Sequence, residues 1–124
     1  MSTSITHYLG IGYKLDYDKY TDRIDDFLDF HPEYSRYEHL NPNADKPGLQ
    51  IIVDGMNGNY IYVMYVLHKT SQYDMYSSNG DVDLSLINAD PESSIAILVR
   101  KLYHMILPDE RVSDPHLVSL FHCA

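Results

Sequence analysis

Two apolar runs on either side of a short glycine-containing segment constrain the fold of this chain more than any other feature. Residues 49–54 and 60–68 are rich in Ile, Val and Tyr, and they flank the sequence Gly-Met-Asn-Gly-Asn at positions 55–59. Such residues favour strands, and a short connection that contains Gly is typical of a hairpin. In the second run both alternating sets of side chains are apolar, which is typical of a central strand. The chain is therefore expected to contain a sheet built around this hairpin.

The segment before the hairpin is expected to supply one strand and one helix. Residues 5–15 carry aromatic and β-branched side chains, which predict a strand in which Gly10 and Gly12 mark a bulge or a close approach of two backbones. From position 17 the apolar residues follow a helical period as far as position 31, and Pro32 marks the end of this helix. Aspartates at its start are candidates for the N-cap. Residues 33–48 contain turn signals without a sustained period and are interpreted as an ordered loop.

The segment after the hairpin is expected to supply a further strand and two helices. Residues 81–86 alternate polar and apolar side chains, which predicts a half-exposed fourth strand beside an extension of the third at residues 72–76. Asp, Pro and Glu at positions 90–92 are typical of a helix start, and the apolar stripe that follows ends before Pro108. Asp and Pro recur at positions 114–115 and predict a short helix that extends to His122.

These elements together predict an α+β fold. Their order is strand, helix, three strands and two helices, which favours a three- or four-stranded, mostly antiparallel sheet with the helices packed against it. A length of 124 residues falls within the range of one domain, so residues 1–124 are interpreted as a single compact domain. Hydrophobic residues make up 44% and charged residues 22%, a composition that excludes an intrinsically disordered chain.

An acidic imbalance limits the partners that the chain is expected to have. The sequence contains 9 Lys and Arg against 18 Asp and Glu, a net charge of −9 at pH 7. Such a surface repels phosphate backbones and anionic lipids, so direct binding to nucleic acid or to a membrane is not expected. The start of the chain shows no signal-peptide pattern, and a single cysteine, Cys123, cannot form an intrachain disulfide. A cytoplasmic location is therefore expected.

The negative charge is concentrated in two tracts. Residues 16–38 contain eight acids and three bases, and residues 70–99 contain five acids and neither Lys nor Arg. In the expected first helix, aspartates spaced i, i+4, i+7 and i+11 fall within about 60° of one another, opposite the apolar stripe. Neighbouring acids are about 4.5 to 6 Å apart along the axis, comparable with the phosphate spacing of a nucleic-acid strand. These residues are Asp18, Asp22, Asp25 and Asp29.

This row of aspartates has two interpretations. An amphipathic helix needs a polar face, and a run of charges often does no more than keep that face in water. Asp is, however, a poor residue for a helix interior, so four of them accept a loss of helix propensity. The second tract also lacks the cations that a salt-bridged surface would contain. A solvated face and a recognition surface both stay open.

Signals for catalysis or for cofactor binding are weak. The seven histidines include no i,i+4 pair, and neither a zinc motif nor a nucleophile motif is present. Two partial calcium-loop patterns, which begin at Asp16 and Asp81, lack the turn glycine, and Gly10 and Gly12 lack the third glycine of a nucleotide loop. The C-terminal group without metal-ligand spacing comprises His104, His116, His122 and Cys123. We therefore expect no enzyme, no cofactor and no metal.

The preferred hypothesis is a small acidic interaction protein that inhibits or neutralises a basic, nucleic-acid-handling macromolecule by occupying its cationic groove. Anti-restriction, anti-CRISPR and toxin-immunity proteins are settings in which compact acidic domains act in this way, although no sequence motif links the chain to them. Steering by the acidic tracts would be followed by burial of tyrosines against the partner. The expected partner-binding residues are Asp18, Asp22, Asp25, Asp26, Asp29, Glu33, Tyr17, Tyr20, Tyr34, Tyr37, Asp74, Asp81 and Asp83.

Two other roles are open on the sequence alone. A tyrosine-rich surface could support a homodimer. The alternative function is a metal-assisted hydrolase or nuclease that uses several Asp and His residues. That function would require three or more of these side chains to converge on one point.

Overall fold

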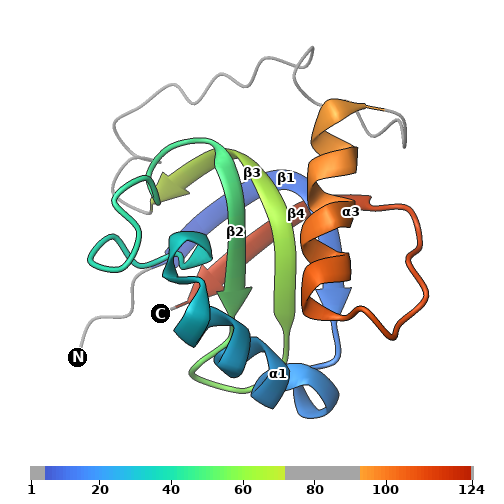
Figure 1. Cartoon of the computed structure of the whole chain (residues 1–124). Coiled ribbons are helices and arrows are strands. Elements are labelled where there is room, and N and C mark those ends of the chain that lie inside the picture. The colour runs from blue at the N-terminus through green and yellow to red at the C-terminus, as the bar shows by residue number, and fades with distance from the viewer. Residues whose placement is uncertain (1–4, 72–92, 124) are drawn as a thin grey trace.

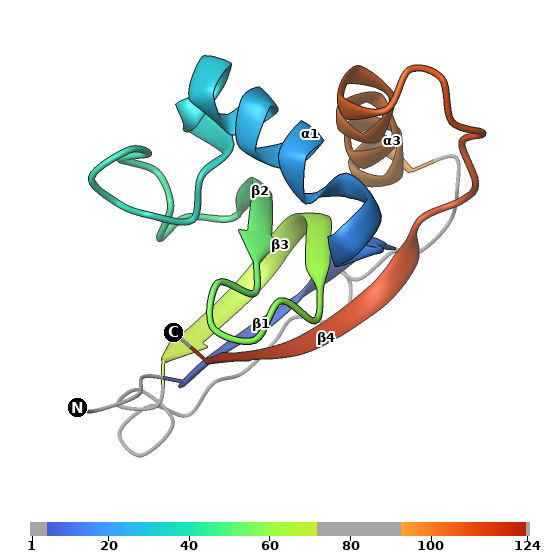
Figure 2. The same cartoon turned by 90° about the horizontal axis from the view of Figure 1, so that it is seen from below.

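The structure is a four-stranded antiparallel sheet with two helices packed on one of its faces (Figures 1 and 2). The computed structural model describes residues 5–71 and 93–123. The strand order across the sheet is β2-β3-β1-β4, and all neighbouring pairs are antiparallel. The elements are β1 (Ile5–Leu15), α1 (Tyr17–Phe30), a 3-10 turn (Pro32–Tyr34), β2 (Gly48–Val53), β3 (Ile61–Ser71), α3 (Ser94–Ile106) and β4 (His116–Cys123).

Strand β1 lies between β3 and β4, and two glycines let β3 approach it closely. The register of β1 against β3 shifts between Leu9 and Gly10, whereas its register against β4 is continuous. A Cβ atom at Gly10 would overlap the carbonyl oxygen of Tyr65, and a Cβ atom at Gly12 would overlap that of Val63. Of the two alternatives predicted for these glycines, the close backbone approach is confirmed, and the register shift lies directly before Gly10, with the unpaired residue on β3.

The face of the sheet that carries the helices contains the larger hydrophobic core. Strands contribute every second residue to it, and α1 and α3 contribute the residues of one helical stripe. Full burial of an aliphatic side chain such as Ile24 contributes about 1.5–3 kcal/mol. The two helices are therefore held mainly by packing rather than by their own propensity. The core residues are Tyr13, Leu15, Tyr20, Ile24, Ile51, Ile61, Val63, Val99, Leu102, Ile106 and Leu107.

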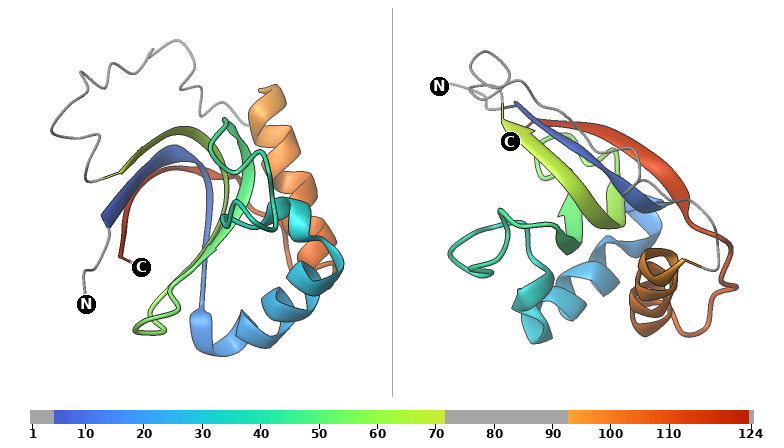
Figure 3. Two further views of the ribbon diagram at one scale, coloured as in Figure 1. Left: turned by 90° about the vertical axis from the view of Figure 1, so that its left-hand side faces the viewer. Right: turned by 90° about the horizontal axis from the view of Figure 1, so that it is seen from above.

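A second hydrophobic cluster lies on the opposite face of the sheet. The curvature of the strands is visible in the side view of Figure 3. It is formed by the other alternating set of strand residues, so Ile51 and Ile52, or Val63 and Met64, point to different cores. This arrangement explains why both sets of side chains in β3 are apolar, and it confirms that β3 is a central strand. The cluster comprises Tyr8, Ile52, Met64, Val66, Val118 and Leu120.

The end of the chain differs from the prediction. Residues 116–123 form strand β4, so the short helix predicted up to His122 is wrong. Side chains of β4 alternate in burial, with Val118, Leu120 and His122 buried. The apolar residues of this short segment fit both a helical and an alternating pattern, and pairing with β1 decides between them.

The predictions for the segment between β3 and α3 lie largely outside the described residues. Helix α3 begins at Ser94, and its N-cap is Ser93, whose hydroxyl accepts the N–H of Ala96; the predicted start at positions 90–92 lies outside the described residues. The strand predicted at 81–86 and the extension at 72–76 also lie outside them. Over the described residues, the fourth strand of the sheet is β4.

Candidate protein-binding surface

Helix α1 forms because its sequence combines an N-cap, a helical apolar stripe and a proline stop. The Asp16 carboxylate accepts the backbone N–H groups of Asp18 and Lys19 at 3.0 and 3.3 Å. Tyr20 and Ile24 are buried against the sheet, and Pro32 follows directly after the C-cap. The opposite side of the helix is exposed and carries the acidic face, which we define as Asp18, Asp22, Asp25 and Asp29.

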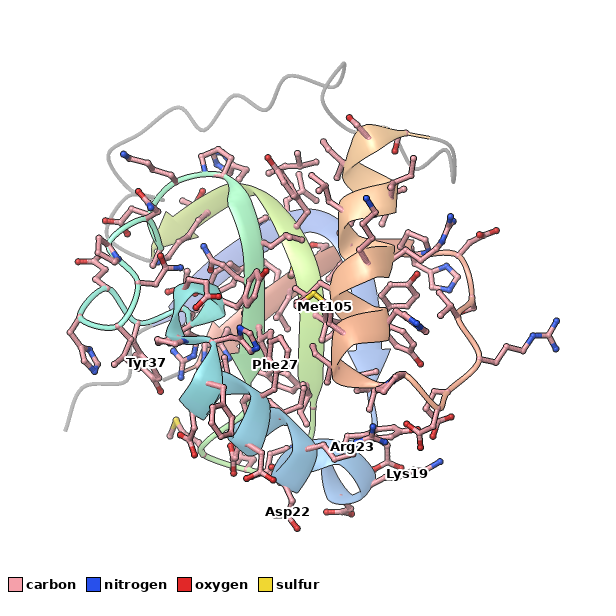
Figure 4. All side chains as sticks on the ribbon, in the orientation of Figure 1. Lys19, Asp22, Arg23, Phe27, Tyr37 and Met105 are labelled. Atoms are coloured by element: carbon pink, nitrogen blue, oxygen red, sulfur yellow. The ribbon has the colours of Figure 1, made fainter. Side chains whose placement is uncertain are left out.

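The two cations of α1 are directed to the loop that follows α3. Arg23 donates to Oδ1 of Asp109 at 2.7 Å and to the carbonyl oxygen of Ile106 at 3.2 Å. The ammonium group of Lys19 lies 3.8 Å from Oε1 of Glu110. In Figure 4 both cations extend toward this loop, whereas Asp22 points away from it.

These ion pairs leave the aspartates of α1 without compensation. The hydrogen bond from Arg23 holds the pKa of Asp109 below its ordinary value, because the guanidinium group stabilises the ionised carboxylate. Within the described residues, none of the five aspartates of α1 has an ion-pair partner. The acidic face therefore projects an unneutralised negative field into solvent.

A hollow lies at the C-terminal half of α1, beside the end of α3. It has a volume of about 330 Å³ and is open to solvent. Its aromatic side is ordered by stacking, because the ring centroids of Phe27 and His31 are 4.4 Å apart and those of Phe27 and Tyr34 are 5.8 Å apart. We define the hollow by its lining residues, Arg23, Asp26, Phe27, Phe30, His31 and Ile106.

The predicted tyrosines lie in different environments. Tyr20 is 9% exposed and belongs to the core, and Tyr17 and Tyr34 are partly buried against that core. Tyr37 is 48% exposed, and the Arg36 guanidinium lies 4.3 Å from the centre of its ring. Of these four side chains, that of Tyr37 offers the most surface to a partner, whereas Tyr20 is used inside the fold.

The remaining predicted acids divide between the exposed surface and the part of the chain that is not described. Asp26 and Glu33 are exposed near the C-terminal end of α1, and Glu33 contacts Nδ1 of His31 at 3.2 Å. Asp74, Asp81 and Asp83 lie outside the described residues. Of the predicted acids, the structure therefore gives positions for the acidic face, Asp26 and Glu33.

A polar pair formed by the buried His122 and the partly buried Tyr60 was missed by sequence reasoning. The hydroxyl group of Tyr60 and Nδ1 of His122 are joined by a hydrogen bond of 2.6 Å, although the two residues are far apart in the sequence. Burial, with the nearby Arg36 charge, lowers the pKa of His122 to about 4, and burial raises that of Tyr60 to about 12. The alternation along β4 was the available signal, but this segment was predicted as a helix, in which alternate residues do not share a face.

Asp54, near this pair, has a structural role in the hairpin loop. Its carboxylate accepts the backbone N–H groups of Met56, Asn57 and Asn59 at 3.1–3.3 Å. Burial alone would raise the pKa of Asp54, but these three hydrogen bonds hold it below the ordinary value. An ionised Asp54 therefore fixes the connection between β2 and β3.

The histidines and the cysteine of the C-terminal group do not form a metal centre in the described part of the chain. His104, His116 and Cys123 are exposed, whereas His122 is buried. Over residues 5–71 and 93–123, no three His, Cys, Asp or Glu side chains converge in a way that could hold a metal ion. The described residues thus offer no positive support for the alternative metal-assisted activity.

Comparison with known proteins finds no match: no protein-family model, no curated protein and no solved structure is significantly similar to the chain. Neither α1 nor α3, the two α-helices described, has the length and apolar character needed to cross a bilayer. Inferences about function therefore depend on the geometry and charge of the surface itself.

Proposed function

We propose that the chain is an acidic interaction protein that binds and inhibits a basic, nucleic-acid-handling macromolecule by placing α1 in its cationic groove. It acts by binding rather than by catalysis. The observation that carries this proposal is the separation of charge on α1. The five aspartates lack ion-pair partners in the described residues, while Lys19 and Arg23 are engaged with the loop after α3.

The dimensions of the helix suit this role. Helix α1 has 14 residues and is therefore about 20 Å long, with the acidic face along most of that length. Uncompensated charge of one sign speeds the encounter with a groove of opposite sign and penalises wrong partners. If the face served only to keep the helix in water, Lys19 and Arg23 could equally have been part of it. They point instead to the loop after α3.

The proposal is tested by affinity capture from the native host at low salt, followed by mass spectrometry. A supporting result is a nucleic-acid-binding protein that the wild-type chain retains and that added duplex DNA displaces. The variant Asp22→Asn/Asp25→Asn should lose this partner, because two charges leave the acidic face. The matched control Glu38→Gln/Asp45→Asn removes two exposed charges from the loop before β2 and should retain it.

One outcome would end the proposal. If the fourfold variant Asp18→Asn/Asp22→Asn/Asp25→Asn/Asp29→Asn captures the partner as well as the wild type at both low and high salt, the acidic face does not recognise it. All four side chains are exposed, so the variant is expected to keep its fold, which circular dichroism would verify.

A further inference from the structure

The hollow lined by Phe27 and Phe30 lies beside the acidic face. We infer that it receives an apolar side chain from a basic amphipathic segment of the partner, with Lys or Arg residues of that segment lying against the surrounding acids. This inference rests on the proposed function and adds to it, because pure charge complementarity would need no apolar contact.

Phe30 is the first observation that supports an apolar anchor. It is 82% exposed, more than any other large hydrophobic side chain in the described residues, and it lines the hollow. Phe27 forms part of the same lining and is held by stacking with His31 and Tyr34. An aromatic surface that is ordered before binding loses little side-chain entropy on contact, which is the usual property of a binding hot spot.

The charge around the hollow defines the rest of the occupant. Asp26 belongs to the lining, Asp29 precedes Phe30, and Glu33 lies in the turn after the helix. The last turn of α1 contains no basic residue, so the negative end of the helix dipole adds to these carboxylates. Arg23 is the cation of the lining, and Asp109 and the carbonyl oxygen of Ile106 already occupy its guanidinium.

The size of the hollow limits how much can enter it. About 330 Å³ lies at the lower end of the range for ligand pockets, ~300–1,000 Å³. Being open to solvent, it suits one or two side chains presented by a larger surface better than an enclosed small molecule. A Leu or Phe side chain flanked by Lys or Arg on a helical segment meets both the apolar and the charge requirement.

Two synthetic helical peptides of about 16 residues test the inference. Both carry the same Lys residues on one face; the first has Leu at the apolar positions, and the second has Ala there. Fluorescence anisotropy would measure the Kd of each peptide for the full chain at about 50 and 200 mM salt. The wild type should bind the Leu peptide about tenfold more tightly than the Ala peptide.

Two exposed phenylalanines provide the test variant and its control. Phe30→Ala should bring the Kd of the Leu peptide to that of the Ala peptide. Phe121→Ala removes a 63% exposed side chain from β4 and should change neither Kd. The inference is overturned if the wild type binds the two peptides equally, or if Phe30→Ala leaves their difference unchanged.

A third variant separates this inference from the proposed function. Asp22→Asn/Asp25→Asn should weaken the binding of both peptides by the same factor and reduce its salt dependence. If this variant changes neither Kd while Phe30→Ala still acts, the hollow is an anchor site but the proposed role of the acidic face is wrong. If this variant weakens both peptides while Phe30→Ala has no effect, the acidic face binds cations without the anchor.

Discussion

At the scale of single residues, His122 links the ionisation of the protein to its stability. Its side chain is 1% exposed, Nδ1 is bonded to Tyr60, and Nε2 has no hydrogen-bond partner in the described residues. A charged imidazolium in this place would be costly, and burial accordingly lowers the pKa of His122 to about 4 from 6.5. The folded chain therefore keeps His122 neutral at pH values where the unfolded chain binds a proton.

The sign of the pH effect follows from this difference. Between pH 6.5 and about 4 the unfolded state holds more protons, so stability falls as the pH is lowered through that range. From about pH 7 to about pH 5 we expect a loss of about 2 kcal/mol from His122. Urea unfolding at both pH values should show a smaller loss for His122→Leu than for the wild type. The pKa of His7 is also lowered, by burial and by His68, and His7 is present in both the wild type and the His122→Leu variant. An equal loss of stability in these two proteins would therefore show that His122 is not the group responsible.

Gly12 supports a second prediction at this scale. A Cβ atom there would meet backbone atoms of Val63 and Met64, which cannot rotate away. Gly12→Ala should therefore destabilise the protein by about 1–3 kcal/mol or more, as measured by urea unfolding. Gly55→Ala is the matched control, because a Cβ atom at Gly55 has no neighbour within 4 Å. Similar losses for the two variants would contradict the close packing of β1 against β3.

At the scale of elements, α1 could be predicted and β4 could not, because the apolar pattern of α1 fits one period and that of β4 fits two. Helix α1 spans 14 residues, long enough for the helical period to exclude a strand, and its cap and stop are local in sequence. Strand β4 spans 8 residues, in which Leu117, Leu120 and Phe121 match a helix stripe. The features that select the strand, pairing with β1 and the contact of His122 with Tyr60, are made with distant residues.

The connection between α1 and α3 can be tested through its two cations. Arg23 bonds Asp109 and also the carbonyl oxygen of Ile106, the last residue of α3, so it caps that helix. Lys19 makes one long ion pair with Glu110 at 3.8 Å, lies 5.1 Å from the centre of the Tyr20 ring, and is more exposed. Arg23→Ala should lower the free energy of unfolding by about 0.5–1 kcal/mol, and Lys19→Ala by much less. Thermal unfolding would compare them, and a larger effect for Lys19→Ala would disprove this ranking.

At the scale of the whole molecule, the parts of the candidate site that were predicted are those set by local spacing. The acidic face follows from i,i+4 and i,i+7 positions on one helix, and its aspartates are exposed together. The hollow joins α1 to Ile106, far along the chain, and the pairing of Arg23 with Asp109 depends on the same contact. Neither could be read from sequence, because the packing of α1 beside α3 is a consequence of the sheet that both cover.

The charge of the whole molecule leads to a final prediction, in which salt has opposite effects on the free protein and on its complex. A chain of net charge −9, with like charges at i,i+4 on α1, repels itself, and added salt screens this repulsion. The melting temperature of the free protein should therefore rise with sodium chloride, whereas retention of a basic partner should fall.

The variant Asp25→Asn/Asp29→Asn isolates the contribution of α1 to this behaviour. Both residues lie in the C-terminal half of the helix, where carboxylates also oppose the helix dipole. At low salt the variant should be more stable than the wild type by about 0.5–1 kcal/mol, and the difference should shrink as salt is added. Asp18→Asn, in the first turn where a carboxylate is favourable, should give no such gain. A wild-type melting temperature that falls with salt would show that self-repulsion does not limit the fold, and that the acidic face carries no cost in stability.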